Sequence, residues 1–177
     1  MILGRNRKVC EMVEIHAVSS DPSDLRRLYG CFPSGVTAIC TIIDGTPVGM
    51  AASAFTAVSL EPPLVAVCVQ NSSTTWPKLR TADRLGVSVL AEHQHRECQT
   101  LAIKEGDRFA GVQWAAGADG AVFVQGAAAW LACSLHAELA AGDHAIALLE
   151  IHGFHANPSC APLIFHASRF RQLAAIV

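Results

Sequence analysis

The hydrophobic and polar positions of this chain form short runs, which is typical of strands rather than of long helices. Val36 to Ile43 and Leu64 to Val69 are apolar and rich in β-branched residues, so both runs predict buried strands. Asp44-Gly45-Thr46-Pro47 predicts a turn that joins the first run to Val48 in a hairpin. Because the stretch Val48 to Val69 holds almost no charge and contains the second run, we expect the rest of the fold to be organised around it.

Small residues dominate the first half of this stretch. Gly49, Ala51, Ala52, Ser53 and Ala54 would let a flat ligand approach the backbone closely. The second half turns at Glu61-Pro62-Pro63, since two residues without a backbone N–H cannot lie in the middle of a sheet. The pattern therefore predicts a strand, a segment of close approach, a rigid corner and a buried strand.

The remaining pattern predicts few helices and several more strands. Helices are expected from Ser20 to Tyr29, from Trp76 to Arg80 after a polar cluster, and from Glu92 to Lys104. Strands are expected at residues 84–91, 121–139, 144–155, 163–166 and 170–173, with a loop at 106–120. No repeated strand-helix-strand order is present, so the sequence predicts a mainly antiparallel, closed or half-closed barrel.

Length and composition limit the classes of function. The 177 residues are enough for one domain, with residues 1–20 as a tail and 21–177 as the folded part. The net charge of −2 predicts no nucleic-acid partner, and the interruption of the apolar runs by Ser, Glu and Pro predicts no membrane partner. The seven scattered cysteines without a C-x-x-C pair predict reduced thiols in a cytoplasmic protein and no metal site.

Two local patterns have alternative structural and functional interpretations. Asn71 to Thr75 precedes a helix and predicts a cap, but its hydroxyls could also bind phosphate with help from Lys78, Arg80 or Arg84. His144 follows Gly142-Asp143 at a strand entry, where a loop can place an imidazole over a ligand. The signatures of a Rossmann dehydrogenase, a zincin and an α/β-hydrolase are missing.

Five motifs in order carry a resemblance to a known family. FPSGVTAICT, VGMAASAFTAVSLEPPLVAVC, NSSTTWPKL, DRFAG and GDH resemble segments of the short flavin reductases that serve two-component monooxygenases. The resemblance covers about residues 24 to 173. It implies a mainly β fold, an antiparallel split β-barrel of the Greek-key, FMN-binding type with a few short flanking helices. It also implies a homodimer that uses NADH or NADPH to reduce FAD or FMN and passes the reduced flavin to a partner monooxygenase.

The same resemblance implies the site residues. The flavin ring would lie against the backbone of residues 50–55, beside residues 36 and 37, with residues 59–62 closing the site and residues 72–75 holding phosphate. His144 is the candidate catalytic residue, and it would meet the nicotinamide nucleotide together with residues 169 and 170. The full candidate set is Val36, Thr37, Met50, Ala51, Ala52, Ser53, Ala54, Phe55, Ser59, Leu60, Glu61, Pro62, Ser72, Ser73, Thr74, Arg84, His144, Arg169 and Phe170.

This sequence departs from the family's pattern at two places. Ala51, Ala52 and Ala54 stand where relatives often carry hydroxyl residues, which predicts weaker, exchangeable flavin binding, and Phe170 stands where a Tyr is common. Three alternatives remain open at this stage. They are a flavin-binding barrel without catalysis, a split-barrel oxidase acting on its own substrate, and a structural barrel that binds no flavin.

Overall fold

The computed structural model describes residues 13–174. Part of the expected tail, residues 1–12, lies outside the described residues, and residues 13–19 form neither helix nor strand. Within the described part the chain folds into twelve strands and three helices. Among these residues, no helix has both the length and the apolar composition that crossing a bilayer requires.

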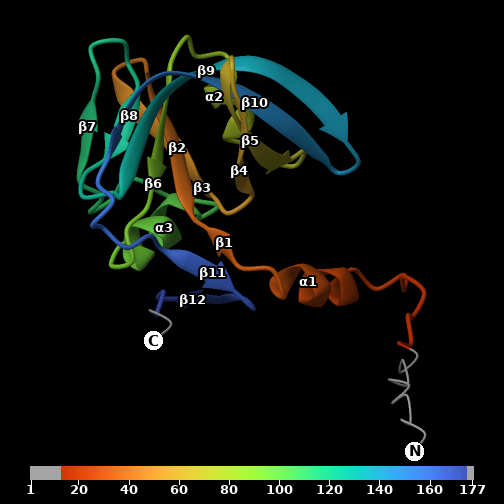
Figure 1. Cartoon of the computed structure of the whole chain (residues 1–177). Coiled ribbons are helices and arrows are strands. Elements are labelled where there is room, and N and C mark those ends of the chain that lie inside the picture. Colours follow the sequence, from red (N-terminus) through yellow and green to blue (C-terminus); the bar gives the residue numbers. More distant parts are fainter. Residues whose placement is uncertain (1–12, 175–177) are drawn as a thin grey trace, which may run out of the picture.

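The main sheet contains seven antiparallel strands. Their order is β3 (Thr46–Ala52), β2 (Thr37–Ile43), β6 (Leu85–Val89), β9 (Ala129–Ala141), β10 (His144–Ala156), β5 (Pro63–Gln70) and β4 (Phe55–Leu60). β3 and β4 lie at opposite edges of this sheet, yet only Ser53 and Ala54 connect them. The sheet therefore curls round until its edges approach each other without pairing, which confirms the expected split barrel (Figure 1).

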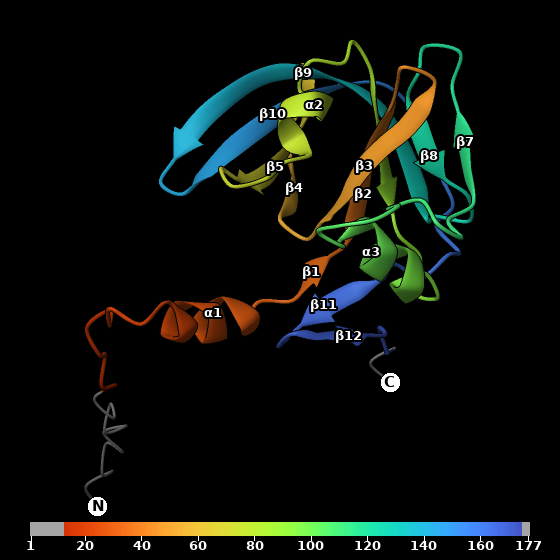
Figure 2. The ribbon, with the colours of Figure 1, turned by 180° about the vertical axis from the view of Figure 1, so that it is seen from behind.

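The alternation of side chains along β2 and β3 supplies two separate cores. Ile39, Met50 and Ala52 point into the barrel, where they join apolar residues of β5, β6, β9 and β10. Cys40 and Ala51 point to the outer side and pack with α3 (His95–Leu101). Figure 2 shows α3 below β2 and β3 on this side. The strand β3 thus has a buried face toward the barrel and a second face toward α3.

Two small sheets complete the outer layer. β7 (Trp114–Ala116) pairs with β8 (Val122–Val124), and β1 (Ser34–Gly35) pairs with β11 (Ile164–His166), which pairs with β12 (Arg169–Arg171). Gly86 of β6 allows β8 to pack directly against it, because a Cβ at this position would lie 2.1 Å from the Val122 carbonyl oxygen. The second sheet brings the end of the chain next to the outer face of β3.

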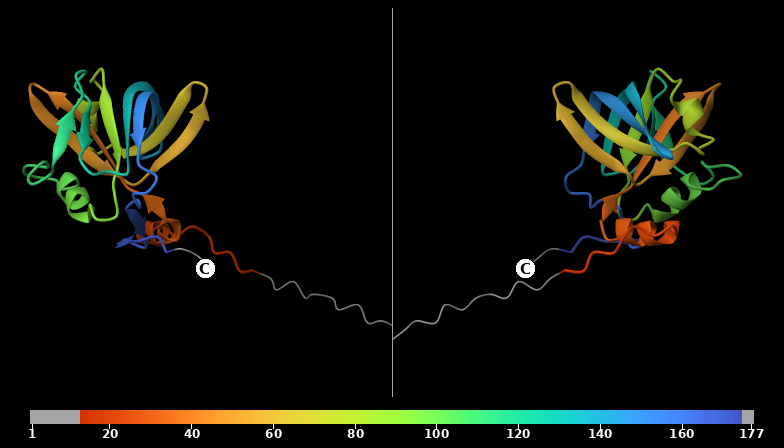
Figure 3. Two further views of the ribbon diagram at one scale, coloured as in Figure 1. Left: turned by 60° about the vertical axis from the view of Figure 1, so that its left-hand side comes forward. Right: turned by 90° about the vertical axis from the view of Figure 1, so that its right-hand side faces the viewer.

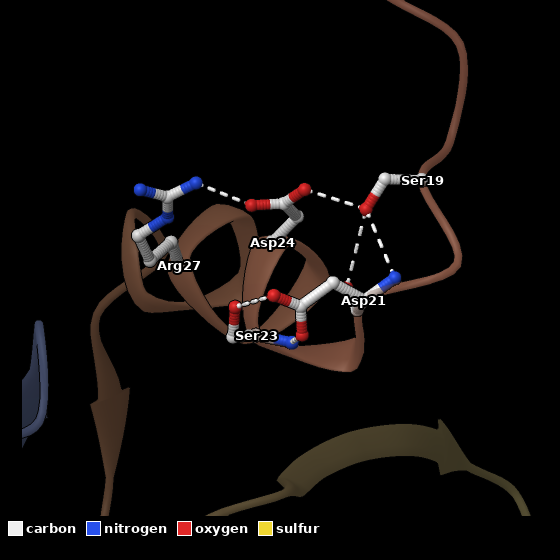
Figure 4. A network of polar contacts seen from close by, with 5 residues as sticks. All are labelled: Ser19, Asp21, Ser23, Asp24 and Arg27. Atoms are coloured by element: carbon white, nitrogen blue, oxygen red, sulfur yellow. Dashed lines mark hydrogen bonds and ion pairs between the residues drawn. The ribbon is translucent and has the colours of Figure 1, made fainter.

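The helix α1 (Pro22–Gly30) is well formed but buries none of its residues. Asp21 accepts hydrogen bonds from the Ser23 backbone and hydroxyl, and Asp24 contacts Ser19 and Arg27 (Figure 4). The hydrogen bonds from Ser23 lower the pKa of Asp21. The helix lies below the barrel beside the small sheet, and the Ala167 N–H donates to its Gly30 carbonyl (Figure 3). Among residues 13–174 the helix is therefore stabilised mainly by its caps.

Most expected elements are confirmed, with corrections at three places. The helix expected at residues 92–104 is shorter, and the loop expected at 106–120 contains β7. The single strand expected at 121–139 is wrong, because a turn at Gly126 with φ of 78° separates β8 from β9. A two-residue crossing at Ser53 and Ala54 leads into β4, a strand that the sequence analysis left unassigned.

Candidate functional site

The helix α2 (Trp76–Leu79) packs with the barrel core on the inner side of β3, and α3 packs against the outer face of this strand. This face carries no charged side chain, and its narrowest point is Gly49, where a Cβ would lie 2.4 Å from the Cys40 Sγ. Any larger residue at Gly49 would push β3 away from β2. The small residues of β3 therefore serve close packing as well as access to the backbone.

A basic cavity of about 380 Å³ opens beside the first half of β3. Pro47, Val48 and Gly49 form its wall on β3, and Thr74 and Thr75 contribute from the segment before α2. Its charged residues are three cations, Lys78 of α2 and Lys104 and Arg108 of the loop after α3, and one anion, Asp107 of the same loop. Three cations and two threonines around one cavity provide the charge and the hydroxyls that phosphate groups bind.

Arg108 also ties its loop to the strand. Its Nη1 donates to the Gly49 carbonyl oxygen over 3.4 Å. Asp107 of the same loop accepts a hydrogen bond from the Phe109 backbone N–H, which fixes the turn that carries Arg108. The cation therefore stays next to β3 rather than extending into solvent.

An apolar cavity of about 250 Å³ opens beside the second half of β3. Its walls are Ala51, Ala52 and Ser53, the aromatic rings of Phe165 and Phe170, and Val36 ahead of β2. The helix α3 closes it with Cys98, Gln99 and Ala102. None of these residues is charged at neutral pH, because burial raises the pKa of the Cys98 thiol to about 11. A flat, uncharged ring system fits such walls.

The two cavities lie next to each other along the same strand. Gly49 lines the first and Ala51 the second, two residues on, a separation of about 7 Å along β3. Just after α3, Ala102 lines the apolar cavity and Lys104, two residues further on, lines the basic one. One elongated ligand with an uncharged ring at one end and phosphate at the other can therefore occupy both.

The structure brings the Ser72 to Thr74 cluster and His144 to the same end of the barrel. The Ser73 hydroxyl accepts a hydrogen bond from the Trp76 backbone N–H and lies 4.0 Å from the Met50 sulfur. His144 begins β10, and the loop just before it is tied to Asn71, whose Nδ2 donates to the Gly142 carbonyl. The Asp143 carboxylate lies 2.7 Å from the His144 Nδ1, and this hydrogen bond lowers the pKa of Asp143.

Several predicted residues lie outside both cavities. Thr37 uses its hydroxyl to donate to the Ala52 carbonyl, which holds β2 against the end of β3. Residues 59 and 60 end β4, and residues 61 and 62 form the turn to β5. Arg84 faces Asp119 just before β6, and Arg169 is exposed on β12. Residues 54 and 55 lie in the crossing to β4 and at its first position, and Phe55 packs against the barrel core. Of the predicted ring-binding set, Val36, Ala51, Ala52 and Ser53 line the apolar cavity, and Phe170, which was expected to meet the nicotinamide together with His144, lines this cavity as well.

Sequence reasoning missed the residues that α3, the loop after it and β11 contribute. They are Cys98, Gln99, Ala102, Lys104 and Phe165, together with the arginine and phenylalanine of the DRFAG motif. That motif supported the resemblance, but no role was assigned to its side chains. The cations at positions 104 and 108, four residues apart across a loop containing Gly106, were the available signal.

A family model described as a flavin reductase like domain matches residues 29–174 of the chain. A flavin reductase of Pseudomonas putida is 36% identical over 164 residues, which cover 92% of this chain and 96% of the relative. The flavin-dependent monooxygenase reductase subunit HsaB of Rhodococcus jostii is 35% identical, over 88% of this chain and 80% of the relative.

A solved structure of a similar protein shares the fold of this chain. The NADH:FAD oxidoreductase SgcE6 of Streptomyces globisporus C-1027, in complex with NAD and FAD fragments, is 37% identical and superimposes with a TM-score of 0.82. The match covers 89% of this chain and 98% of that one.

Proposed function

The chain belongs to the family of flavin reductase-like domains, and on this basis we propose that it is an NAD(P)H-dependent flavin reductase whose flavin lies along β3. The observation that carries the proposal is the pair of adjoining cavities, one basic and one apolar, along that edge strand. A flavin nucleotide has the matching shape, with an uncharged ring system joined to phosphate by a sugar-alcohol chain.

The residues present fit this ligand. Ala51 and Ala52 have short side chains, so a ring in the apolar cavity can pack close to the backbone of β3. Lys78, Lys104 and Arg108 supply positive charge where the phosphate end would lie. FAD is the proposed flavin and NADH the proposed electron donor, by analogy with SgcE6, whose name joins the two.

When bound, the flavin supplies the redox chemistry, since it accepts a hydride from the reduced nicotinamide and a proton from solvent. The chain's own residues bind and orient. The basic cavity would hold the phosphate end, and the apolar cavity would exclude water from one face of the ring, with Ser53 at the start of the crossing to β4 beside it. No side-chain nucleophile or metal is needed for this role.

The proposal includes release of the product to an oxygenase. Ser53 is the one side-chain hydroxyl among the six residues from Met50 to Phe55, which favours exchangeable binding in the micromolar range. HsaB, a relative, is named as the reductase subunit of a flavin-dependent monooxygenase. We place this chain in the same role, as the component that reduces flavin for a partner monooxygenase.

A homodimer and a cytoplasmic location are further parts of the proposal. The unpacked helix α1 presents Leu28 and Tyr29, which are 62% and 66% exposed, and Phe32 just beyond it is 78% exposed. Apolar surface of this kind favours a partner copy. The six described cysteines are free thiols, which is in keeping with a reducing compartment.

A steady-state assay tests the function. Initial rates of nucleotide oxidation are measured with NADH and NADPH, each against FAD, FMN and no added flavin. We expect a rate that depends on added flavin and is highest with NADH and FAD. A protein that binds flavin but leaves it oxidised in the presence of either nucleotide would instead be a non-catalytic flavin-binding barrel.

A further inference from the structure

The apolar cavity contains one side chain whose hydrogen-bond donor and acceptor are two separate groups, side by side. Six of its nine lining residues are alanine, valine or phenylalanine, and a seventh is a buried thiol that remains protonated. The other two are Ser53 and Gln99. A carboxamide has both a carbonyl oxygen and an NH₂ group, whereas a hydroxyl has one donor.

The position of Gln99 on α3 is fixed by its neighbours. Gln94 anchors the start of the helix, because its Oε1 accepts from the Ala91 N–H and its Nε2 donates to the Gln125 carbonyl. Cys98 and Leu101 are buried against the second core, which sets the rotation of the helix. Gln99 and Ala102, three residues apart, consequently share the face that borders the cavity.

The amide of Gln99 forms no hydrogen bond with any residue in the described part of the chain, and the residue is exposed. A ring that enters the cavity displaces the water around this amide. The imide edge of an isoalloxazine ring, with a carbonyl beside an N–H, would then be buried among apolar walls and would need a partner of the same kind. A carboxamide can meet such an edge with two parallel hydrogen bonds.

We infer that Gln99 is a specificity-determining residue that binds the imide edge of the flavin ring in the apolar cavity. The inference rests on the proposed function, because it assumes that the ring in this cavity is a flavin. It assigns recognition of the ring to α3 and leaves recognition of the phosphate to the basic cavity. A reduced nicotinamide also carries an amide group, so the experiment must separate the two ligands.

Riboflavin is the probe, because it carries the ring and the sugar-alcohol chain but no phosphate. Its binding to the full chain is measured by quenching of its fluorescence, alongside FAD. In Gln99→Leu, which has a similar size but no hydrogen-bonding group, we expect both ligands to bind about tenfold more weakly, as for the loss of one or two hydrogen bonds. Gln99→Glu, which keeps the acceptor and loses the NH₂ donor, should also weaken both.

Gln113→Leu is the matched control. Gln113 is an exposed glutamine that lines neither cavity, so its substitution should leave both affinities unchanged. Circular dichroism and the melting temperature establish that each variant is folded, which is expected since Gln99 is exposed.

Two outcomes overturn the inference. One is a folded Gln99→Leu variant that binds riboflavin like the wild type. The other is an unchanged riboflavin affinity with a raised KM for NADH, which would assign the amide to the nicotinamide. Failure of the proposed function would look different, because the wild-type protein itself would then bind neither riboflavin nor FAD.

Discussion

His144 carries its imidazole at the first position of β10, with Nδ1 held by the Asp143 carboxylate at 2.7 Å. A carboxylate on one ring nitrogen fixes the orientation of the imidazole and leaves Nε2 available for a ligand. The site lies at the end of the barrel where Asn71 joins the Ser72 to Thr74 cluster. His144 lines neither cavity, and we propose that it contacts the nicotinamide nucleotide rather than the flavin ring.

Replacing this imidazole separates catalysis from binding. In His144→Ala we expect kcat/KM for NADH to fall about tenfold or more, a loss of about 1.4 kcal/mol of transition-state stabilisation, with FAD affinity unchanged. Initial rates against NADH at saturating FAD give the first quantity, and a flavin titration gives the second. His152→Ala is the control, since that exposed imidazole bonds to Ser134 outside both cavities. Wild-type kcat/KM in a folded His144→Ala variant would remove this residue from the site.

At this scale the sequence could identify only part of the site. The small residues at positions 51–53 and the aromatic at 170 follow motifs, and the structure brings them together in one cavity. Gln99 and Lys104 could not be assigned, because their surroundings form only when α3 and its following loop pack against a strand about fifty residues earlier in the chain. Spacing along the sequence does not record such a contact.

Among the elements, α2 depends on a contact with the distant strand β9. Trp76 is buried, and its indole Nε1 donates to Glu138 Oε2 over 2.6 Å, while Arg80 Nη1 donates to the other carboxylate oxygen over 2.9 Å. One carboxylate thus holds both ends of this four-residue helix. Because Lys78 and Thr75 of the basic cavity lie at the same helix, Glu138 indirectly positions the phosphate-binding groups.

Removing this carboxylate should affect stability and phosphate binding together. In Glu138→Ala the buried indole N–H loses its partner, so we expect a loss of about 1–3 kcal/mol in the free energy of unfolding. FAD binding should weaken more than riboflavin binding, since only FAD uses the basic cavity. Urea denaturation and flavin titrations measure the two effects. Glu150→Ala, which removes a partly exposed partner of His136, should change stability by less than about 0.5 kcal/mol. Equal weakening of both flavins would argue against a positioning role.

The pattern of the sequence predicted most strands but not all of their limits. β2, β5 and β10 contain continuous runs of apolar residues, which mark buried strands. The strand β7 was missed because all three of its residues are exposed, so burial leaves no alternation to detect. The break between β8 and β9 was missed because Gly126 is a weak sign of a turn in the sequence. The hydrogen bond from Trp130 Nε1 to the Val124 carbonyl, which spans this turn, depends on the folded structure and leaves no pattern in the sequence.

At the scale of the whole molecule, the barrel remains open between β3 and β4, and α1 lies outside it without burying a residue (Figures 1 and 3). A nine-residue helix is only marginally stable in water unless its apolar face is packed. Leu28 and Tyr29 are adjacent and exposed near the end of the helix, and Phe32 just beyond it is exposed as well. These features favour a second copy of the chain as the partner that covers the apolar residues of α1.

Light scattering at micromolar concentration tests this assembly. We expect a mass twice the 18.7 kDa of one chain, because the exposed apolar residues of α1 would be covered in the pair. Leu28→Glu combined with Tyr29→Glu should shift the protein toward the monomer, whereas Arg26→Glu on the same helix serves as the charge control. A wild-type mass of one chain that persists with FAD added would contradict the homodimer.

The central claim is that one flavin lies along β3 with its phosphate in the basic cavity and its ring in the apolar cavity. The most direct test compares FAD and riboflavin binding to a variant that carries both Lys104→Ala and Arg108→Ala. Since charge-assisted hydrogen bonds to phosphate contribute more than neutral ones, we predict that FAD binding weakens about tenfold or more while riboflavin binding stays at the wild-type value. An unchanged FAD affinity, or equal weakening of both ligands, would contradict this placement of the flavin.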